Sequence, residues 1–125
     1  MKSQAQLHQE LRQKILALSG VIERPNAGIH DDAFFVGSIM FMHIHGYGHC
    51  DIRLSKDLQQ RVLAEGKARP HRWAPGAGYV TFMVKAEKDL EPGMDLIRQS
   101  HAFFAEFATH SRTQRPIPEE SVTYV

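Results

Sequence analysis

Histidines and one aspartate gather in the short stretch HIHGYGHCD, whose residue types are those of metal and acid–base sites. His43 and His45 are two positions apart, so on a strand they point to the same face, about 6.6 Å apart along the chain. Such a pair can converge on one ion. Neutral imidazole and carboxylate both suit zinc or iron. His49, Asp51 and His71 are candidates for further ligands, and the metal-site hypothesis is the set His43, His45, Asp51 and His71.

The same residues also have other interpretations. Strand alternation places His43 and His45 on a face with Ile39 and Phe41, which predicts hydrogen-bonded histidines at the rim of a core. Asp51 begins a strand and could orient a histidine for general-base catalysis. It could equally cap the preceding turn through backbone amides. The pattern leaves both roles open.

A second dense stretch is KARPHRW, where alternation places Arg69, His71 and Trp73 on one face and Pro70 and Arg72 on the other. Cations beside a histidine and an indole suit an anion, or a nucleic-acid backbone with a stacking platform. The structural interpretation is an edge strand protected by its proline and positive charge. Arg69, Arg72 and Trp73 are therefore candidate ligand-binding residues, while His71 is also a candidate for the catalytic cluster.

Composition narrows the function classes. Lys and Arg total 15 against 14 Asp and Glu, a formal net charge of +1, which disfavours a dedicated nucleic-acid binder. Cys50 is the one cysteine, so no internal disulfide can form, and a reducing compartment is expected. Because Cys50 alternates with Ile52 and Leu54, we expect a buried, inert thiol. No apolar stretch is long enough for a membrane span, so we expect a soluble, cytoplasmic protein.

Hydrophobic periodicity predicts the elements that must position these residues. Helical spacing covers 4–18, and apolar strand-like runs at 33–36 and 39–45 flank a Gly37-Ser38 turn. The segment between the first helix and these strands is expected to be a loop, with an extended piece at 21–23. A strand at 50–54, a helix capped by Ser55, strands near 68–73 and at 78–84, and a helix at 89–110 follow.

This order predicts a single α+β domain over 1–125, with irregular tails near 1–3 and 111–125. Its antiparallel sheet would have about five strands, two hairpins plus one strand, with helices packed on one face. If Met40, Met42 and Ile44 formed an uncovered apolar face, a homodimer would be favoured.

Four motifs taken together resemble a bacterial and fungal family described as the luciferase domain. They are H-x-x-G-x-x-D-I-x-L from His45, G-K-A-x-x-H-R-W from Gly66, P-G-x-G-Y-V-T-F from Pro75 and D-L-x-x-x-x-x-L-I-R-x-S from Asp89. The resemblance implies a polar cluster of His45, Asp51 and His71, with matching glycines at Gly48, Gly66 and Gly78. His43 and His49 fall outside the family pattern. The family description alone implies no light emission.

Three functions follow from these observations. The preferred one is small-molecule binding or acid–base catalysis by His45, Asp51 and His71, on an anionic or oxygenated ligand. Its ligand-binding residues would be Arg69, Arg72, Trp73, Gly48 and Gly78. The element order is also similar to the YjbR/MmcQ-like fold, which implies a nucleic-acid or protein interaction module as an alternative. The third is the metal site. The sequence names neither a cofactor nor a ligand.

Overall fold

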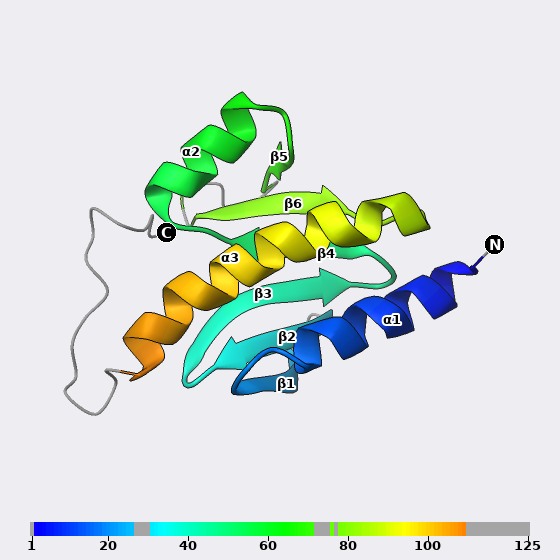
Figure 1. The fold of residues 1–125 in the computed structure, drawn as a ribbon, viewed down its shortest axis with the longest axis horizontal. Coiled ribbons are helices and arrows are strands. Elements are labelled where there is room, and N and C mark those ends of the chain that lie inside the picture. The colour runs from blue at the N-terminus through cyan, green and yellow to red at the C-terminus, as the bar shows by residue number, and fades with distance from the viewer. Residues whose placement is uncertain (1, 27–30, 72–75, 77, 110–125) are drawn as a thin grey trace.

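The computed structural model describes residues 2–26, 31–71, 76 and 78–109, which form an α+β domain with one antiparallel sheet (Figure 1). The strand order is β1-β2-β3-β4-β6-β5. The elements are α1 (Gln4–Leu16), β1 (Val21–Asn26), β2 (Asp31–Val36), β3 (Ile39–His45), β4 (His49–Arg53), α2 (Lys56–Ala64), β5 (Arg69–Pro70), β6 (Tyr79–Met83), the 3-10 turn η2 (Glu87–Asp89) and α3 (Leu90–Thr109). The predicted fold class is confirmed.

The helices form where the sequence supplies caps and one apolar stripe. Ser3 closes a capping box at the start of α1, and the Ser55 side chain accepts a hydrogen bond from the Leu58 amide at the start of α2. In α1, Leu7, Leu11 and Ile15 recur at helical spacing and are buried. Figure 1 shows α1 and α3 crossing the same face of the sheet, as predicted.

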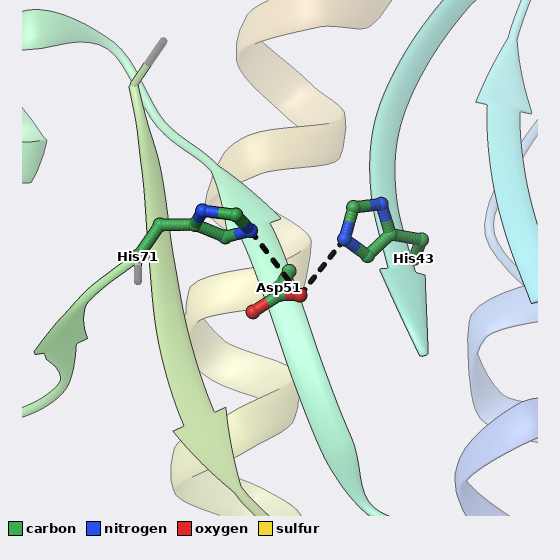
Figure 2. A group of neighbouring side chains, drawn as sticks. All are labelled: His43, Asp51 and His71. Carbon is green, nitrogen blue, oxygen red and sulfur yellow. Dashed lines mark hydrogen bonds and ion pairs between the residues drawn. The ribbon is translucent and has the colours of Figure 1, made fainter. Parts of the chain in front are cut away.

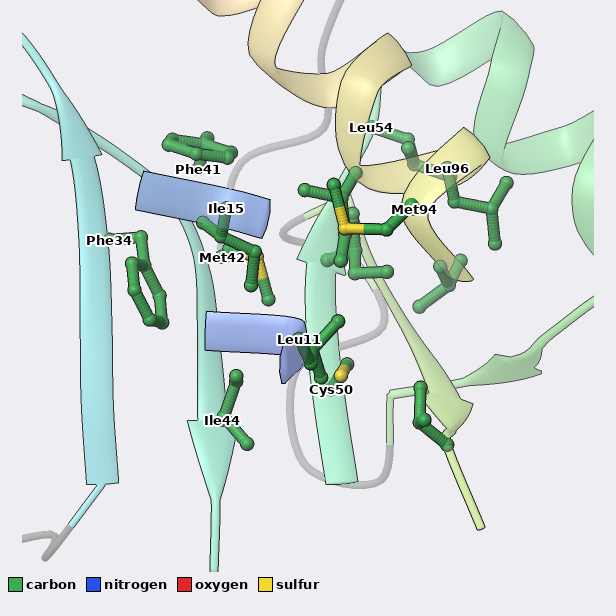
Figure 3. Packing of buried hydrophobic residues seen from close by; sticks show 14 of the residues in the cluster. Leu11, Ile15, Phe34, Phe41, Met42, Ile44, Cys50, Leu54, Met94 and Leu96 are labelled. Atoms are coloured by element: carbon green, nitrogen blue, oxygen red, sulfur yellow. The ribbon is translucent and has the colours of Figure 1, made fainter. Parts of the chain in front are cut away.

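The core lies between these helices and that face, which we call the core face (Figure 3). On β4, Cys50 and Ile52 are fully buried in it, together with Leu54 just beyond the strand. Asp51 alternates with them and therefore points to the opposite face, which we call the open face. The predicted alternation along β4 is confirmed.

A β-bulge in β3 decides which residues share a face. Phe34 pairs with Met42, but the next residue of β2 pairs with Met40, so Phe41 is an extra residue on β3. Its ring is fully buried, and its carbonyl oxygen lies 3.2 Å from the Ser100 hydroxyl of α3. The bulge is therefore held from the helix layer.

This bulge overturns the predicted face of two histidines. Ile39 and Phe41 pack with the core, and so does Ile44, while His43 lies on the open face opposite Asp51. Simple alternation from Ile39 would have placed His43 with the core residues. Because the bulge adds one residue, the alternation reverses at Phe41 and frees His43 and His45 for the open face.

The other differences concern the sheet edges. The sheet has six strands rather than about five, because the expected loop contains β1 (Val21–Asn26), which pairs with β2 along its length. The strand expected near 68–73 is only the two-residue β5, and Arg72 and Trp73 lie outside the described residues. Of the apolar residues Met40, Met42 and Ile44, Met42 and Ile44 are buried in the core and Met40 is half-buried, so they do not form one uncovered face. The homodimer stays a prediction. Among the described helices, none is long and apolar enough to cross a membrane.

Candidate metal centre

Four histidines converge on one carboxylate at the open face. Three of them direct Nε2 at Asp51 Oδ2: His43 at 2.8 Å, His45 at 2.9 Å and His71 at 3.4 Å. The fourth, His49, has Nε2 3.3 Å from Asp51 Oδ1. Figure 2 shows His43 and His71 pointing at Asp51 from opposite sides. The carboxylate is thus the hub of the cluster, which we call the His/Asp centre.

Strand register explains why these side chains meet. His43 on β3 is directly opposite Asp51 on β4, and Asp51 is directly opposite Thr81 on β6. Paired residues share a face of the sheet, so the three form a row across neighbouring strands. Thr81 Oγ1 donates a hydrogen bond of 2.7 Å to Asp51 Oδ1. Backbone pairing therefore fixes the hub and two of its neighbours.

His71 arrives from the sheet edge. It follows β5, which pairs with β6, and its side chain reaches past β6 toward Asp51 on β4 (Figure 2). Tyr79 of β6 supports it: the Tyr79 ring lies 5.7 Å from the His71 ring and stacks on His43 at 5.4 Å. Aromatic contacts of this kind hold ring orientation. Tyr79 therefore positions one imidazole on each side of the hub.

The solvent exposure of the side chains increases from Asp51 to His49. The Asp51 side chain is 1% exposed and that of His71 is 10% exposed, while that of His49 is 39% exposed. The carboxylate therefore lies at the bottom of the cluster and His49 lies at its rim. A small ligand approaching the open face would meet the histidines before the aspartate.

Electrostatics keeps the hub ionised. Burial raises the pKa of Asp51, but hydrogen bonds from His43 and Thr81, with the charges of His43 and His71, outweigh it and lower the pKa to about 2. The pKa of His71 is lowered, mainly by burial, with His43 and His45 adding to the effect and Asp51 opposing it. An ionised carboxylate and a neutral imidazole are the states in which these groups bind metal ions.

The structure brings together the three residues that the family resemblance implied, His45, Asp51 and His71. It also adds His43 and His49, which that pattern left out, so the cluster is larger than expected. Three groups named in the metal-site hypothesis, those of His43, Asp51 and His71, have potential ligand atoms within 4.8 Å of one another. His45 contacts the same carboxylate oxygen.

The other predicted ligand-binding residues lie elsewhere. Arg69 is exposed and lies opposite Thr81, one strand away from the row of the centre. Gly48 and Gly78 are buried turn residues with positive φ. A Cβ on Gly48 would lie 2.2 Å from the Val84 carbonyl oxygen, so this glycine lets the turn pack against the end of β6. A ligand contact at either glycine stays a prediction.

Thr81 and Tyr79 were missed as site residues. Both belong to the motif P-G-x-G-Y-V-T-F and alternate on one face of a predicted strand, so the sequence held a signal. This alternation does not place Thr81 and Tyr79 at the site unless the pairing of β6 with β4 is known. That pairing joins strands separated by α2 and β5, and no local pattern specifies it.

The comparisons with known proteins agree with the motif analysis. Residues 39–100 match the family model described as Luciferase domain. These residues belong to the Luciferase domain family. The matched stretch runs from β3 into α3 and contains every side chain of the His/Asp centre, together with Thr81 and Tyr79. The helix α1 and the strands β1 and β2 lie outside it.

A search of curated proteins and a search of solved structures each found no match. The similarity to the YjbR/MmcQ-like fold therefore stays a prediction. The family match is limited to residues 39–100, and the chemistry has to be argued from the centre itself.

Proposed function

We propose that this Luciferase domain binds a divalent first-row metal ion at His43, His45, Asp51 and His71 and uses it on a small molecule that enters from the open face. The observation that carries the proposal is the convergence of three imidazole Nε2 atoms on a single carboxylate oxygen, Asp51 Oδ2. Three nitrogens and one oxygen are a donor set that proteins use for zinc and iron.

Hydrogen bonding alone is a poor explanation of this geometry. A carboxylate oxygen has two lone pairs, yet three nitrogen atoms lie within 3.4 Å of Oδ2. A central ion instead accepts a lone pair from each nitrogen and from the oxygen. With metal–ligand bonds of about 2.0–2.2 Å, tetrahedral ligands lie about 3.4 Å apart. The nitrogen–oxygen distances of 2.8 to 3.4 Å are at or below this spacing, and the ligand atoms of His43, Asp51 and His71 all lie within 4.8 Å of one another, so small side-chain shifts would seat an ion.

The donor set limits which ion fits. His43, Asp51 and His71 alone form a two-histidine, one-carboxylate set of the kind that leaves open positions on Fe(II). His45, whose Nε2 lies 2.9 Å from Asp51 Oδ2, would supply the fourth ligand of a tetrahedral zinc site. Both ions act on small molecules by polarising an oxygen atom or activating a bound water. The proposal is therefore a metal-dependent small-molecule site.

The neighbouring side chains have supporting roles in this proposal. Thr81 holds Asp51 through its hydroxyl, and Tyr79 holds the rings of His43 and His71. Such contacts orient ligands and tune their basicity. His49 is the most exposed histidine of the centre and is placed to exchange a proton with a bound molecule.

Titration of the metal-free chain with Zn²⁺ and with Fe²⁺ by calorimetry tests the proposal. We expect saturable binding of one ion per chain, with the affinity reduced more than about 100-fold in Asp51→Asn and His71→Ala. His101→Ala is the matched control, because His101 on α3 contacts the Ser19 carbonyl and the Phe41 ring and none of the proposed ligands. An affinity equal in the three variants, or the absence of binding by the wild type, would overturn the metal site.

A second candidate is favoured by the short contact of 2.9 Å between His45 Nε2 and Asp51 Oδ2. In it, His45, Asp51 and His71 act directly as an acid–base group on a small molecule, because a carboxylate raises the basicity of its histidine. Chelation separates the two candidates. Treatment with EDTA abolishes the function of a metal centre and leaves a purely organic acid–base site unchanged.

A further inference from the structure

A groove of about 570 Å³ lies beside the His/Asp centre, along β6 where β5 ends. One wall is the segment before β5, from Gly66 to Arg69, and the other is the segment after β6, from Lys85 to Asp89. Thr81, Phe82 and Met83 form its floor. Because β5 pairs with β6 only at Val80 and Thr81, the rest of this edge of β6 borders the groove rather than a described strand.

The lining of the groove is strongly cationic. Four basic side chains, all on exposed residues, border it: Lys67, Arg69, Lys85 and Lys88. One acidic residue, Asp89, also lines it, but its carboxylate already accepts hydrogen bonds from the backbone amides of Lys85 and Ala86. Two acids adjoin the lining: Glu65, whose Oε1 lies 3.6 Å from Lys67 Nζ, and Glu87, whose Oε1 lies 3.2 Å from Lys2 Nζ. The described lining therefore favours an anion.

The groove and the centre share a wall. Thr81 lines the groove and also donates its hydroxyl hydrogen bond to Asp51. Arg69 is the Cα partner of Thr81, which is in turn the partner of Asp51. With neighbouring strands about 4.8 Å apart, Arg69 lies about 10 Å from Asp51 across the open face. One small molecule can therefore span both.

We propose that this groove binds the carboxylate or phosphate group of a small organic substrate whose other end reaches the metal ion. This inference rests on the proposed function of the His/Asp centre and names its substrate class: a compact organic acid or phosphate monoester. Arginine and lysine recognise both anions through charge-assisted hydrogen bonds. The groove volume is that of a small-molecule site.

The arrangement favours a small anion over a nucleic acid. The four cations surround one groove instead of following an extended face of the sheet. The whole chain has a formal net charge of only +1, whereas nucleic-acid binders carry a clear basic excess. An oligonucleotide is nevertheless a necessary comparison in the test, because phosphate is common to both ligands.

The test is a titration of the full-length chain, freed of metal with EDTA and then exchanged into EDTA-free buffer at low salt, and followed by amide NMR signals. The probes are inorganic phosphate, succinate and a single-stranded DNA oligonucleotide. We expect saturable binding of phosphate or succinate that shifts the signals of residues 66–69 and 81–86. The double variant Lys67→Gln, Arg69→Gln should bind the same probe at least about 10-fold more weakly.

A matched control removes the same charge elsewhere. Lys14→Gln with Lys56→Gln changes two exposed lysines of α1 and α2 and should leave the anion affinity unchanged. An equal loss of anion affinity in both double variants would overturn the proposal that this groove binds the anion. The absence of saturable anion binding by the wild type would do the same. If the oligonucleotide binds more tightly than phosphate or succinate, with a steep dependence on salt, the groove is part of a nucleic-acid-binding surface instead.

The same variants separate this inference from the proposed function. Neither double variant changes a proposed metal ligand, so both should bind Zn²⁺ with wild-type affinity in the absence of EDTA. Anion binding without metal binding would leave the groove in place and remove the metal centre. Metal binding without anion binding would support the metal centre and rule out anion binding in the groove.

Discussion

The two faces of the sheet are built from alternate residues of the same strands, yet they are organised in opposite ways. On the core face, apolar side chains from many elements pack into one cluster. Ile52 belongs to this cluster, which is not arranged around any single residue. On the open face, five polar side chains depend on the position of one carboxylate, that of Asp51. The first face distributes its contacts and the second concentrates them.

This difference predicts how each face responds to change. A core residue contributes to the free energy of unfolding in proportion to the apolar area and packing it loses. A residue of the His/Asp centre mainly sets the geometry of a few polar atoms near solvent. Substitutions on one face should therefore change stability, and those on the other should change binding.

The largest expected effect is on the core face. Ile52→Ala should lower the free energy of unfolding by about 2–5 kcal/mol, because Ile52 is fully buried and the helices cannot collapse onto the space it leaves. Denaturant unfolding measures the loss. At temperatures where the variant is folded, its Zn²⁺ affinity should match that of the wild type. A loss of affinity as large as that of Asp51→Asn would erase the distinction between the faces.

A smaller effect is expected where the two faces are coupled. The Ser100 hydroxyl lies within hydrogen-bond distance of two carbonyl oxygens, that of Phe41 at the bulge and that of Arg53 on β4, so Ser100→Ala should leave a carbonyl without this donor and cost about 1–3 kcal/mol. Because the bulge sets the direction of His43, the Zn²⁺ affinity should also fall, by about 10-fold. Ser100→Thr, which keeps the hydroxyl, is the control. Normal metal binding by a destabilised Ser100→Ala would show that the bulge does not depend on this contact.

Thr81→Val should act on the open face, with little effect on packing. It removes the hydrogen bond to Asp51 Oδ1, so the pKa of Asp51 should rise from about 2 toward the ordinary aspartate value, and Zn²⁺ affinity should fall by about 10-fold.

The pH dependence of Thr81→Val follows from the same contact. A carboxyl whose pKa is lowered on folding stabilises the fold above its unfolded pKa, and this stabilisation is lost as the pH falls through the folded pKa. The metal-free variant should therefore be less stable than the wild type above about pH 4, and the gap should close near pH 2. A gap that persists at pH 2 would point to packing instead.

The smallest effect concerns Cys50, which lies next to Asp51 in sequence but on the other face. Burial raises the pKa of its thiol to about 12, with the Asp51 charge adding to the effect. At pH 8 a thiol-specific reagent should therefore leave the folded chain unmodified and react with one thiol after unfolding. Rapid modification of the folded chain would mean that the core face opens readily beneath the centre.

The sequence predicted one face better than the other. Alternation of Cys50, Ile52 and Leu54 was enough to send Asp51 to the open face, because strand geometry depends only on neighbours in the chain. The face of His43 and His45 was predicted wrongly, since the bulge at Phe41 arises from pairing with β2 and contact with α3. The strand β1 was missed because its proline and asparagine are turn residues in most contexts.

The centre itself was predicted in part. The motif resemblance placed His45, Asp51 and His71 in one cluster, and the structure brings them together. It did not include His43 or His49, which join through the β3–β4 pairing, nor Thr81, which joins through β6. The separate metal-site hypothesis had named His43 and His49 as candidate ligands, so Thr81 is the member that required knowledge of which strands are neighbours, and that depends on contacts between distant parts of the chain.

The reach of His71 toward Asp51 has a consequence for the outermost strand. Within the described part of the chain, β5 has two paired residues, and one of them is Pro70, which offers no backbone donor to the ladder. These few backbone hydrogen bonds hold β5 weakly. The contact between His71, the residue after β5, and Asp51 on β4 is a further tether that holds this edge to the interior of the sheet. Releasing that tether with His71→Ala would let residues 66–71 exchange their amide hydrogens faster than the rest of the domain, while a captured ion would slow them.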